Sequence, residues 1–193
     1  MSKQLILLIG NIGVGKSTVA SILVKKFGFT EKTFAEPLKN FAISIGFDPH
    51  QVYGTQNQKL EINNFWGISG REFLQKFGTE ICRNSLPLVI PDMKFNGLQI
   101  WARVMERHIN ENEKLVISDG RFEDEAQLVK KYGGIIIKIC RNCNEEQKNS
   151  GMEKNISNHK SETELNGIKE DISINNNGTI EELEKKISSI LNL

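Results

Sequence analysis

The stretch GNIGVGKST, Gly10 to Thr18, follows directly after the apolar run LILLI, Leu5 to Ile9. It places three glycines, a lysine and two hydroxyl side chains within nine residues. Glycine loses more conformational entropy on folding than any other residue and adds no side chain to a core. We therefore expect this loop to serve something outside the fold, a bound ligand.

The P-loop pattern, Gly-x-x-x-x-Gly-Lys-Ser, is matched by residues 10–17, between a predicted strand and a predicted helix. In such a loop successive main-chain N–H groups surround phosphate oxygens, and the helix N-terminus adds partial positive charge. Lys16 can reach the β- and γ-phosphates, and the Ser17 hydroxyl can bind Mg²⁺. The alternative is a glycine turn that matches by chance, in on the order of one in a hundred chains of this size. The sequence predicts a nucleotide site.

The composition is that of an ordinary globular chain and indicates one domain. The chain has 193 residues, 38% of them hydrophobic and 25% charged, with a net charge of +1. That charge gives no reason to expect a nucleic-acid polymer as partner. No apolar run has the length of a signal peptide core or a membrane span, so we expect an intracellular, cytoplasmic protein without a membrane partner. The oligomeric state stays open, with a homodimer as one alternative.

Three cysteines, Cys82, Cys140 and Cys143, are an odd number. The spacing Cys140-x-x-Cys143 is compatible with a zinc or redox site, but a zinc site would need a second matched pair. Free thiols are the simpler interpretation.

Apolar runs and turn residues predict alternating strands and helices. The predicted strands are residues 5–9, 32–35, 114–118, 135–140 and 172–174. The predicted helices are residues 16–27, 37–45, 69–84, 98–112, 123–132 and one capped by Thr179. Residues 50–67 indicate a helix plus a loop, and residues 86–93, with two prolines, a connector. This alternation predicts an α/β fold with three layers, a parallel sheet covered by helices on both faces.

Residues outside the loop indicate which kind of P-loop protein this is. GTPases carry an Asn-Lys-x-Asp motif that reads guanine, and the sequence has none. Mechanical ATPases usually place a glutamate directly after the aspartate that ends the second nucleotide strand. Here Gly120 follows Asp119, and Arg121 comes next. An arginine there suits the binding of a second phosphate better than the activation of water.

The helix predicted from Ser69 begins with a capping-box pattern and carries two faces. Helical spacing predicts a core face of Phe73, Leu74, Phe77 and Ile81. Four polar residues at steps of four lie on the roughly opposite side, namely Arg71, Gln75, Thr79 and Arg83. A solvated face and a substrate-binding face both explain this stripe. Gly78 costs about 1 kcal/mol relative to alanine in mid-helix unless a neighbour must approach closely.

The chain resembles the phage-type deoxynucleoside monophosphate kinases, which also occur in large DNA viruses. The matching segments are GNIGVGKST (10–18), FAEPLK (34–39), GREFLQKFGTEICR (70–83), Trp101, ISDGRFEDEA (117–126), GGIIIKICR (133–141), NHKSE (158–162) and DISINNNGTIEELEKKI (171–187). Their order along the chain is more specific than any one of them apart from the P-loop. The family more often has an aspartate where Glu36 stands and a valine where Gly120 stands, and beyond Arg141 this chain has lysines where the family has arginines.

The resemblance implies a P-loop NTPase fold of the nucleoside monophosphate kinase type, as one domain over residues 1–193. An acceptor-binding helical region would cover about 36–112 and a lid segment about 141–162. It implies transfer of the γ-phosphate of ATP to a deoxynucleoside 5′-monophosphate, with Mg²⁺. The rivals are another P-loop kinase, of the dephospho-coenzyme A or ribonucleotide type, and a P-loop ATPase that is not a kinase.

The same resemblance implies roles for individual residues. ATP would be held by Gly10, Asn11, Gly13, Val14, Gly15, Lys16, Ser17, Thr18 and Arg141. The monophosphate would be held by Lys39, Arg71, Gln75, Thr79, Arg83, Trp101, Asp119 and Arg121. Mg²⁺ would be bound by Ser17 and Asp119, and the catalytic cations would be Lys16, Arg121 and Arg141. Trp101 is equally explained as a core residue, and Lys39 as a solvated one.

The polar segment from Asn142 to His159 is explained by a lid that excludes water from the bound nucleotides, or by disorder. His159, Ser161 and Glu162 form a polar cluster at its end, and a capped helix start there is the alternative to a role in the lid.

Overall fold

The computed structural model describes residues 3–95, 99–141 and 164–191. It divides the chain into two compact units, Met1–Thr33 with Met105–Leu193, and Phe34–Val104. The acceptor-binding helical region expected over 36–112 stays a prediction. The expected lid, with His159, Ser161 and Glu162, lies outside the described residues apart from its first residue, Arg141. Within the described ranges no helix has the length and apolar character to cross a membrane.

The first unit is built on five parallel strands in the order β2-β3-β1-β4-β5. Their bounds are β1 Gln4–Ile9, β2 Thr30–Lys32, β3 Lys114–Ile117, β4 Ile135–Cys140 and β5 Ile172–Asn175. The central strand β1 pairs Leu5 with Leu115 on one side and Leu7 with Ile136 on the other. The chain leaves β1 between two strands that come much later in the sequence, and parallel sheets bind ligands at such a point.

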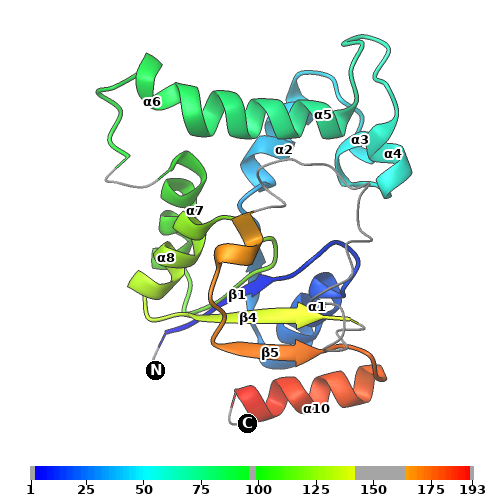
Figure 1. Cartoon of the computed structure of the whole chain (residues 1–193), viewed down its shortest axis with the longest axis vertical. Helices are drawn as coiled ribbons and strands as arrows, with labels where there is room; N and C mark the ends of the chain where they lie inside the picture. Colours follow the sequence, from blue (N-terminus) through cyan, green and yellow to red (C-terminus); the bar gives the residue numbers. More distant parts are fainter. Residues whose placement is uncertain (1–2, 96–98, 142–163, 192–193) are drawn as a thin grey trace. The chain divides into compact units, whose positions relative to one another are not determined.

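Helices cover both faces of this sheet, as the sequence predicts. Alternate residues of β1, such as Ile6 and Leu8, pack in one core with α1 (Lys16–Phe27) and α10 (Ile180–Ile190). Figure 1 shows α10 running beside β5. Leu5, whose side chain points to the other face, lies close to Gly134, as does Val129 of α8 (Glu123–Lys131). Side chains of successive strand residues point to opposite faces, so a strand buried on both faces is apolar throughout.

The helix α7 (Ile100–Glu111) joins the two units in sequence. In the first unit its Glu106 is 6% exposed and accepts hydrogen bonds from the Tyr132 hydroxyl at 2.9 Å and from Lys131 at 3.3 Å. These bonds join α7 to the end of α8.

The second unit is helical. Its elements are α2 Glu36–Ser44, α3 Pro49–Tyr53, α4 Gln56–Leu60, α5 Gly70–Gln75, the π-helix η1 Lys76–Ser85 and α6 Leu86–Val89. Aromatic rings pack against one another in this unit. The ring centroids are 5.2 Å apart for the stacked pair Phe73 and Phe77, and 5.1 Å apart for Phe77 and Phe41. In Figure 1, α5 and the π-helix form one continuous rod. The predicted core positions Phe73, Leu74 and Phe77 are partly buried, as expected.

Three local predictions are wrong in ways that the structure explains. The strand expected at 32–35 is at Thr30–Lys32, because this edge strand has exposed or half-buried side chains and therefore no apolar pattern. The connector expected over 86–93 begins with a helical turn, α6, which has Pro87 in its first turn. Ile81, expected in the core, is 50% exposed. The π-helix pairs i with i+5, so its turns are wider and move Ile81 off the core face.

Candidate active site

The loop between β1 and α1 contains three glycines with positive φ, Gly10 at 140°, Gly13 at 83° and Gly15 at 99°. A Cβ at Gly10 would overlap with the main-chain oxygen of Ile139, and one at Gly15 would overlap with the side-chain amide of Asn176. A Cβ at Gly13 would meet no atom within 4 Å. The backbone conformation favours glycine at all three positions, and the space around Gly13 is open.

The first turn of α1 presents positive charge. Its N-cap, Gly15, supplies no side-chain bond, and the turn contains no acidic residue. The Lys16 ammonium donates hydrogen bonds to the carbonyls of Gly10 at 2.6 Å and Asn11 at 2.8 Å, so it lies against the loop. A helix N-terminus without a side-chain cap, an ammonium and an open loop fit a polyphosphate. The loop residues expected to bind ATP are thus brought together.

Two oxygen ligands proposed for Mg²⁺ lie in the first unit. Ser17 is exposed in the first turn of α1, and Asp119 is half-buried just after β3. Among the described residues, no three histidine, cysteine or acidic side chains group to hold a metal. This pair fits Mg²⁺, which usually keeps waters and substrate phosphates beside one or two protein ligands.

The segment after Asp119 is held firmly to the sheet. The Gly120 N–H donates to the carbonyl of Leu8 at 3.2 Å, and a Cβ at Gly120 would lie 2.6 Å from Leu7 Cδ1. Glycine therefore suits this backbone, although the family more often has valine. The buried Glu125 carboxylate accepts the main-chain N–H groups of Arg121 at 2.9 Å and Phe122 at 3.1 Å. Glu125, which the sequence analysis missed, thus fixes the main chain at Arg121.

Arg141 follows β4 directly, at the carboxyl edge of the sheet. Its Nε donates to the carbonyl of Asn176 at 3.2 Å. Asn176 stands just after β5 and is 8% exposed; its side-chain amide donates to the carbonyl of Val14 at 2.9 Å. No motif in the sequence distinguishes Asn176. The one available signal was its place after the last strand, within a run of three asparagines.

The acceptor candidates Lys39, Arg71, Gln75, Thr79, Arg83 and Trp101 all lie in the second unit. The Lys39 ammonium stands 5.0 Å from the centre of the Tyr53 ring. Burial raises the pKa of the Tyr53 hydroxyl, and the charge of Glu36 raises it further. Arg71 Nη1 donates to Gln56 Oε1 at 2.8 Å. These two cations are thus ordered by polar and aromatic neighbours of their own unit.

The polar stripe on the predicted helix differs from a solvated face. Thr79 is 8% exposed and Arg83 is 5% exposed, because the wider turns of the π-helix carry them inward. The simple solvated-face interpretation is therefore wrong for these two residues. Arg71 and Gln75 are half-buried.

Gly78 allows two close contacts within the second unit. A Cβ there would lie 2.5 Å from Leu38 Cδ2, and the Trp101 indole N–H donates to its carbonyl at 2.9 Å. Since an indole has a single donor, Trp101 has only its ring to offer a substrate. The expectation that something approaches Gly78 closely is confirmed, but the neighbours are Leu38 and Trp101.

Two of the three cysteine thiols lie in the described part of the chain. Cys82 and Cys140 are free, and burial raises the pKa of the Cys82 thiol, which keeps it protonated. Cys143 lies outside the described residues.

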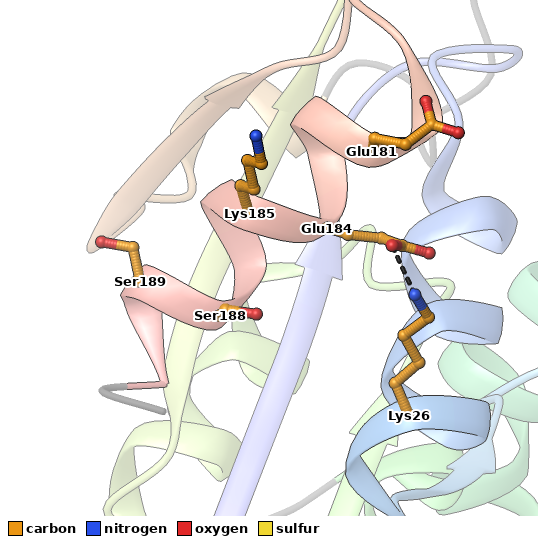
Figure 2. A pocket seen from close by; sticks show the side chains of 6 residues that line it. All are labelled: Lys26, Glu181, Glu184, Lys185, Ser188 and Ser189. Atoms are coloured by element: carbon orange, nitrogen blue, oxygen red, sulfur yellow. Dashed lines mark hydrogen bonds and ion pairs between the residues drawn. The ribbon is translucent and has the colours of Figure 1, made fainter.

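A hollow between α1 and α10 lies beside the phosphate loop. Its outer part is lined by Lys26, Glu181, Glu184, Lys185, Ser188 and Ser189. A second, adjoining part includes Ser17 and Thr18. Figure 2 shows the Lys26 ammonium of α1 and the Glu184 carboxylate of α10 pointing toward one another as an ion pair. Its lining combines lysines with two carboxylates, and the Lys26–Glu184 ion pair joins α1 to α10.

A glycine loop between β1 and α1 at the carboxyl edge of a parallel sheet defines a P-loop protein. The chain belongs to the deoxynucleotide monophosphate kinase family, whose model matches residues 45–187, and it is thus a phosphotransferase. A relative from Acanthamoeba polyphaga mimivirus, provisionally named a deoxynucleotide monophosphate kinase, is 38% identical over 96% of this chain and 94% of its own. The resemblance seen in the sequence is confirmed.

Solved P-loop kinases are more distant. Shikimate kinase from Aquifex aeolicus is 19% identical with a TM-score of 0.49, covering 97% of this chain and 96% of its own. Dephospho-CoA kinase from Campylobacter jejuni is 14% identical with a TM-score of 0.45, covering 98% and 96%.

Proposed function

We propose that the protein transfers the γ-phosphate of ATP to a deoxynucleoside 5′-monophosphate, giving ADP and the deoxynucleoside diphosphate. Membership of the family supports the reaction. The observation that supports ATP binding is the open space at Gly13, together with the Lys16 ammonium and a helix N-terminus that has no side-chain cap.

The acceptor needs no strong general base. Its phosphate is a dianion at neutral pH and already nucleophilic, so catalysis rests on holding two polyanions in line and neutralising charge as it moves. Arginine and lysine side chains on a rigid frame suit this task better than a titrating base.

On the donor side, the loop N–H groups and Lys16 would bind the triphosphate. Ser17 and Asp119 would hold Mg²⁺, which when bound neutralises charge on the β- and γ-phosphates. Arg141 would present its guanidinium to the transferred group. A well-placed arginine contributes on the order of 10³ to 10⁵ in rate.

On the acceptor side, Arg71 and Arg121 would bind the monophosphate, with Arg83 as a weaker candidate. Gln75, Thr79 and the Trp101 ring would contact the base and sugar. The bonds from Glu125 support this role for Arg121, because they restrict the main chain from which its side chain extends.

A coupled assay of ADP release across a panel of acceptors tests the proposal. We expect release that depends on a deoxynucleoside monophosphate. Preference for shikimate, dephospho-coenzyme A or ribonucleotides would favour another kinase. Release that needs no acceptor and rises with nucleic acid or protein would favour a mechanical ATPase. A cytoplasmic location accords with this substrate and stays a prediction.

A further inference from the structure

Three successive asparagines begin at the last residue of β5, and the middle one differs from its neighbours. Asn176 is buried, while Asn175 and Asn177 are exposed. Its Nδ2 donates to the carbonyl of Val14 at 2.9 Å, in a buried hydrogen bond between the loop after β5 and the phosphate loop. Buried polar side chains are kept where such bonds compensate for the loss of water.

The sheet fixes the position from which this side chain extends. The Asn176 N–H donates to the carbonyl of Cys140 at 2.8 Å, which prolongs the pairing of β4 and β5 by one residue. On the other side, the amide lies so close to Gly15 that a Cβ there would overlap with it. Asn176 is thus a rigid support against the Val14–Gly15 peptide.

The orientation of the Val14–Gly15 peptide matters for phosphate binding. In a planar trans peptide the C=O and the N–H point in opposite directions. Because the Val14 carbonyl is turned to Asn176 on the buried side, the Gly15 N–H is directed away from Asn176. Loss of the amide donor would free the peptide to rotate and turn that N–H away from a phosphate.

We propose that Asn176 is a positioning residue for ATP: its side-chain amide holds the Val14–Gly15 peptide in the orientation that binds the triphosphate. This inference rests on the proposed function, but the effect of Asn176 on ATP binding can be measured without phosphoryl transfer. The Arg141 Nε also donates to the Asn176 carbonyl, so the same residue supports a second cation of the donor site.

The test compares the full-length wild type with Asn176→Ala, Asn176→Asp and the matched control Asn175→Ala. Aspartate has nearly the shape of asparagine but, when ionised, has no donor. Binding of a non-hydrolysable ATP analogue with Mg²⁺ is measured by calorimetry. The kcat and the KM of each substrate come from the coupled assay, and thermal unfolding without nucleotide reports stability.

Loss of one buried hydrogen bond predicts ATP binding on the order of tenfold weaker, or more, for both Asn176 variants. We expect kcat to fall as well and the acceptor KM to stay within about twofold of wild type, because the lost interaction lies on the donor side. Asn175→Ala should match the wild type. A merely structural role would lower thermal stability without this split between the two substrates.

Wild-type ATP affinity in either Asn176 variant would overturn the proposal. So would an equal loss in Asn175→Ala, or unfolding of both Asn176 variants, since Asn176 would then serve general stability. The experiment distinguishes failure of the proposed kinase reaction from failure of the positioning role of Asn176. If the wild type shows no phosphoryl transfer while ATP binding still depends on Asn176, the proposed kinase reaction fails and the positioning role stands.

Discussion

Removal of the Glu125 carboxylate is expected to loosen the segment that carries Arg121. This carboxylate is 2% exposed and accepts two main-chain N–H groups, from Arg121 at 2.9 Å and Phe122 at 3.1 Å. Hydrogen bonds to a charged acceptor contribute roughly 1.5–3 kcal/mol each. In Glu125→Ala, water can bond to the partly buried Arg121 N–H and recover part of the loss. The free energy of unfolding should therefore fall by about 3 kcal/mol.

Urea unfolding of the full chain, followed by circular dichroism, measures this change. Glu125→Gln keeps an acceptor oxygen and should cost only about 1 kcal/mol. Glu123→Ala, an exposed position in the same helical turn, is the control and should stay within about 0.5 kcal/mol of wild type. In the folded fraction, Glu125→Ala should raise the acceptor KM more than the ATP KM. A loss no larger than that of Glu123→Ala would refute the reasoning.

Three further predictions concern single side chains. Lys16→Ala should reduce kcat by several orders of magnitude with an unchanged melting temperature, whereas Lys25→Ala, exposed on the same helix, should be nearly normal. Arg71→Ala should weaken use of the monophosphate more than use of ATP, and equal losses in steady-state kinetics would place the acceptor elsewhere. Burial opposes ionisation of Asp171, but bonds from Lys130 and the Ile136 N–H outweigh it and lower the pKa of this carboxyl below its usual 3.8. A lowered folded pKa stabilises above the unfolded value, so the advantage of wild type over Asp171→Asn should be complete at pH 6 and decline below about pH 4. Unfolding curves that keep the same separation down to pH 2 would contradict it.

The fold was predictable where local sequence and burial agree. The helix Lys16–Phe27 and the strand Ile135–Cys140 have the predicted bounds, because one ends at a glycine and the other is apolar at every position except Lys138. The edge strand β2 lacked that signal, since its side chains are exposed or half-buried. The strand order depends on long-range pairing, and the central strand β1 pairs with residues of β3 and β4 more than a hundred positions away, which no local pattern encodes.

In the candidate site, too, features set by local sequence were predictable and features set by tertiary contacts were not. The loop motif predicted the bend and the position of Lys16, both of which are local. The burial of Thr79 and Arg83 could not be predicted, because helical spacing assumes 3.6 residues per turn and this segment is a π-helix. Asn176 could not be chosen among three adjacent asparagines, since only its contact with Val14 distinguishes it.

We expect the bend at the start of α1 to bind the triphosphate while arginines hold a second phosphate next to it. A crystal structure with an ATP analogue, Mg²⁺ and a deoxynucleoside monophosphate tests it most directly. We predict phosphate oxygens within hydrogen-bond distance of the loop N–H groups and Lys16, with the monophosphate against Arg71 and Arg121. A loop without phosphate, or a monophosphate bound away from both arginines, would contradict the claim.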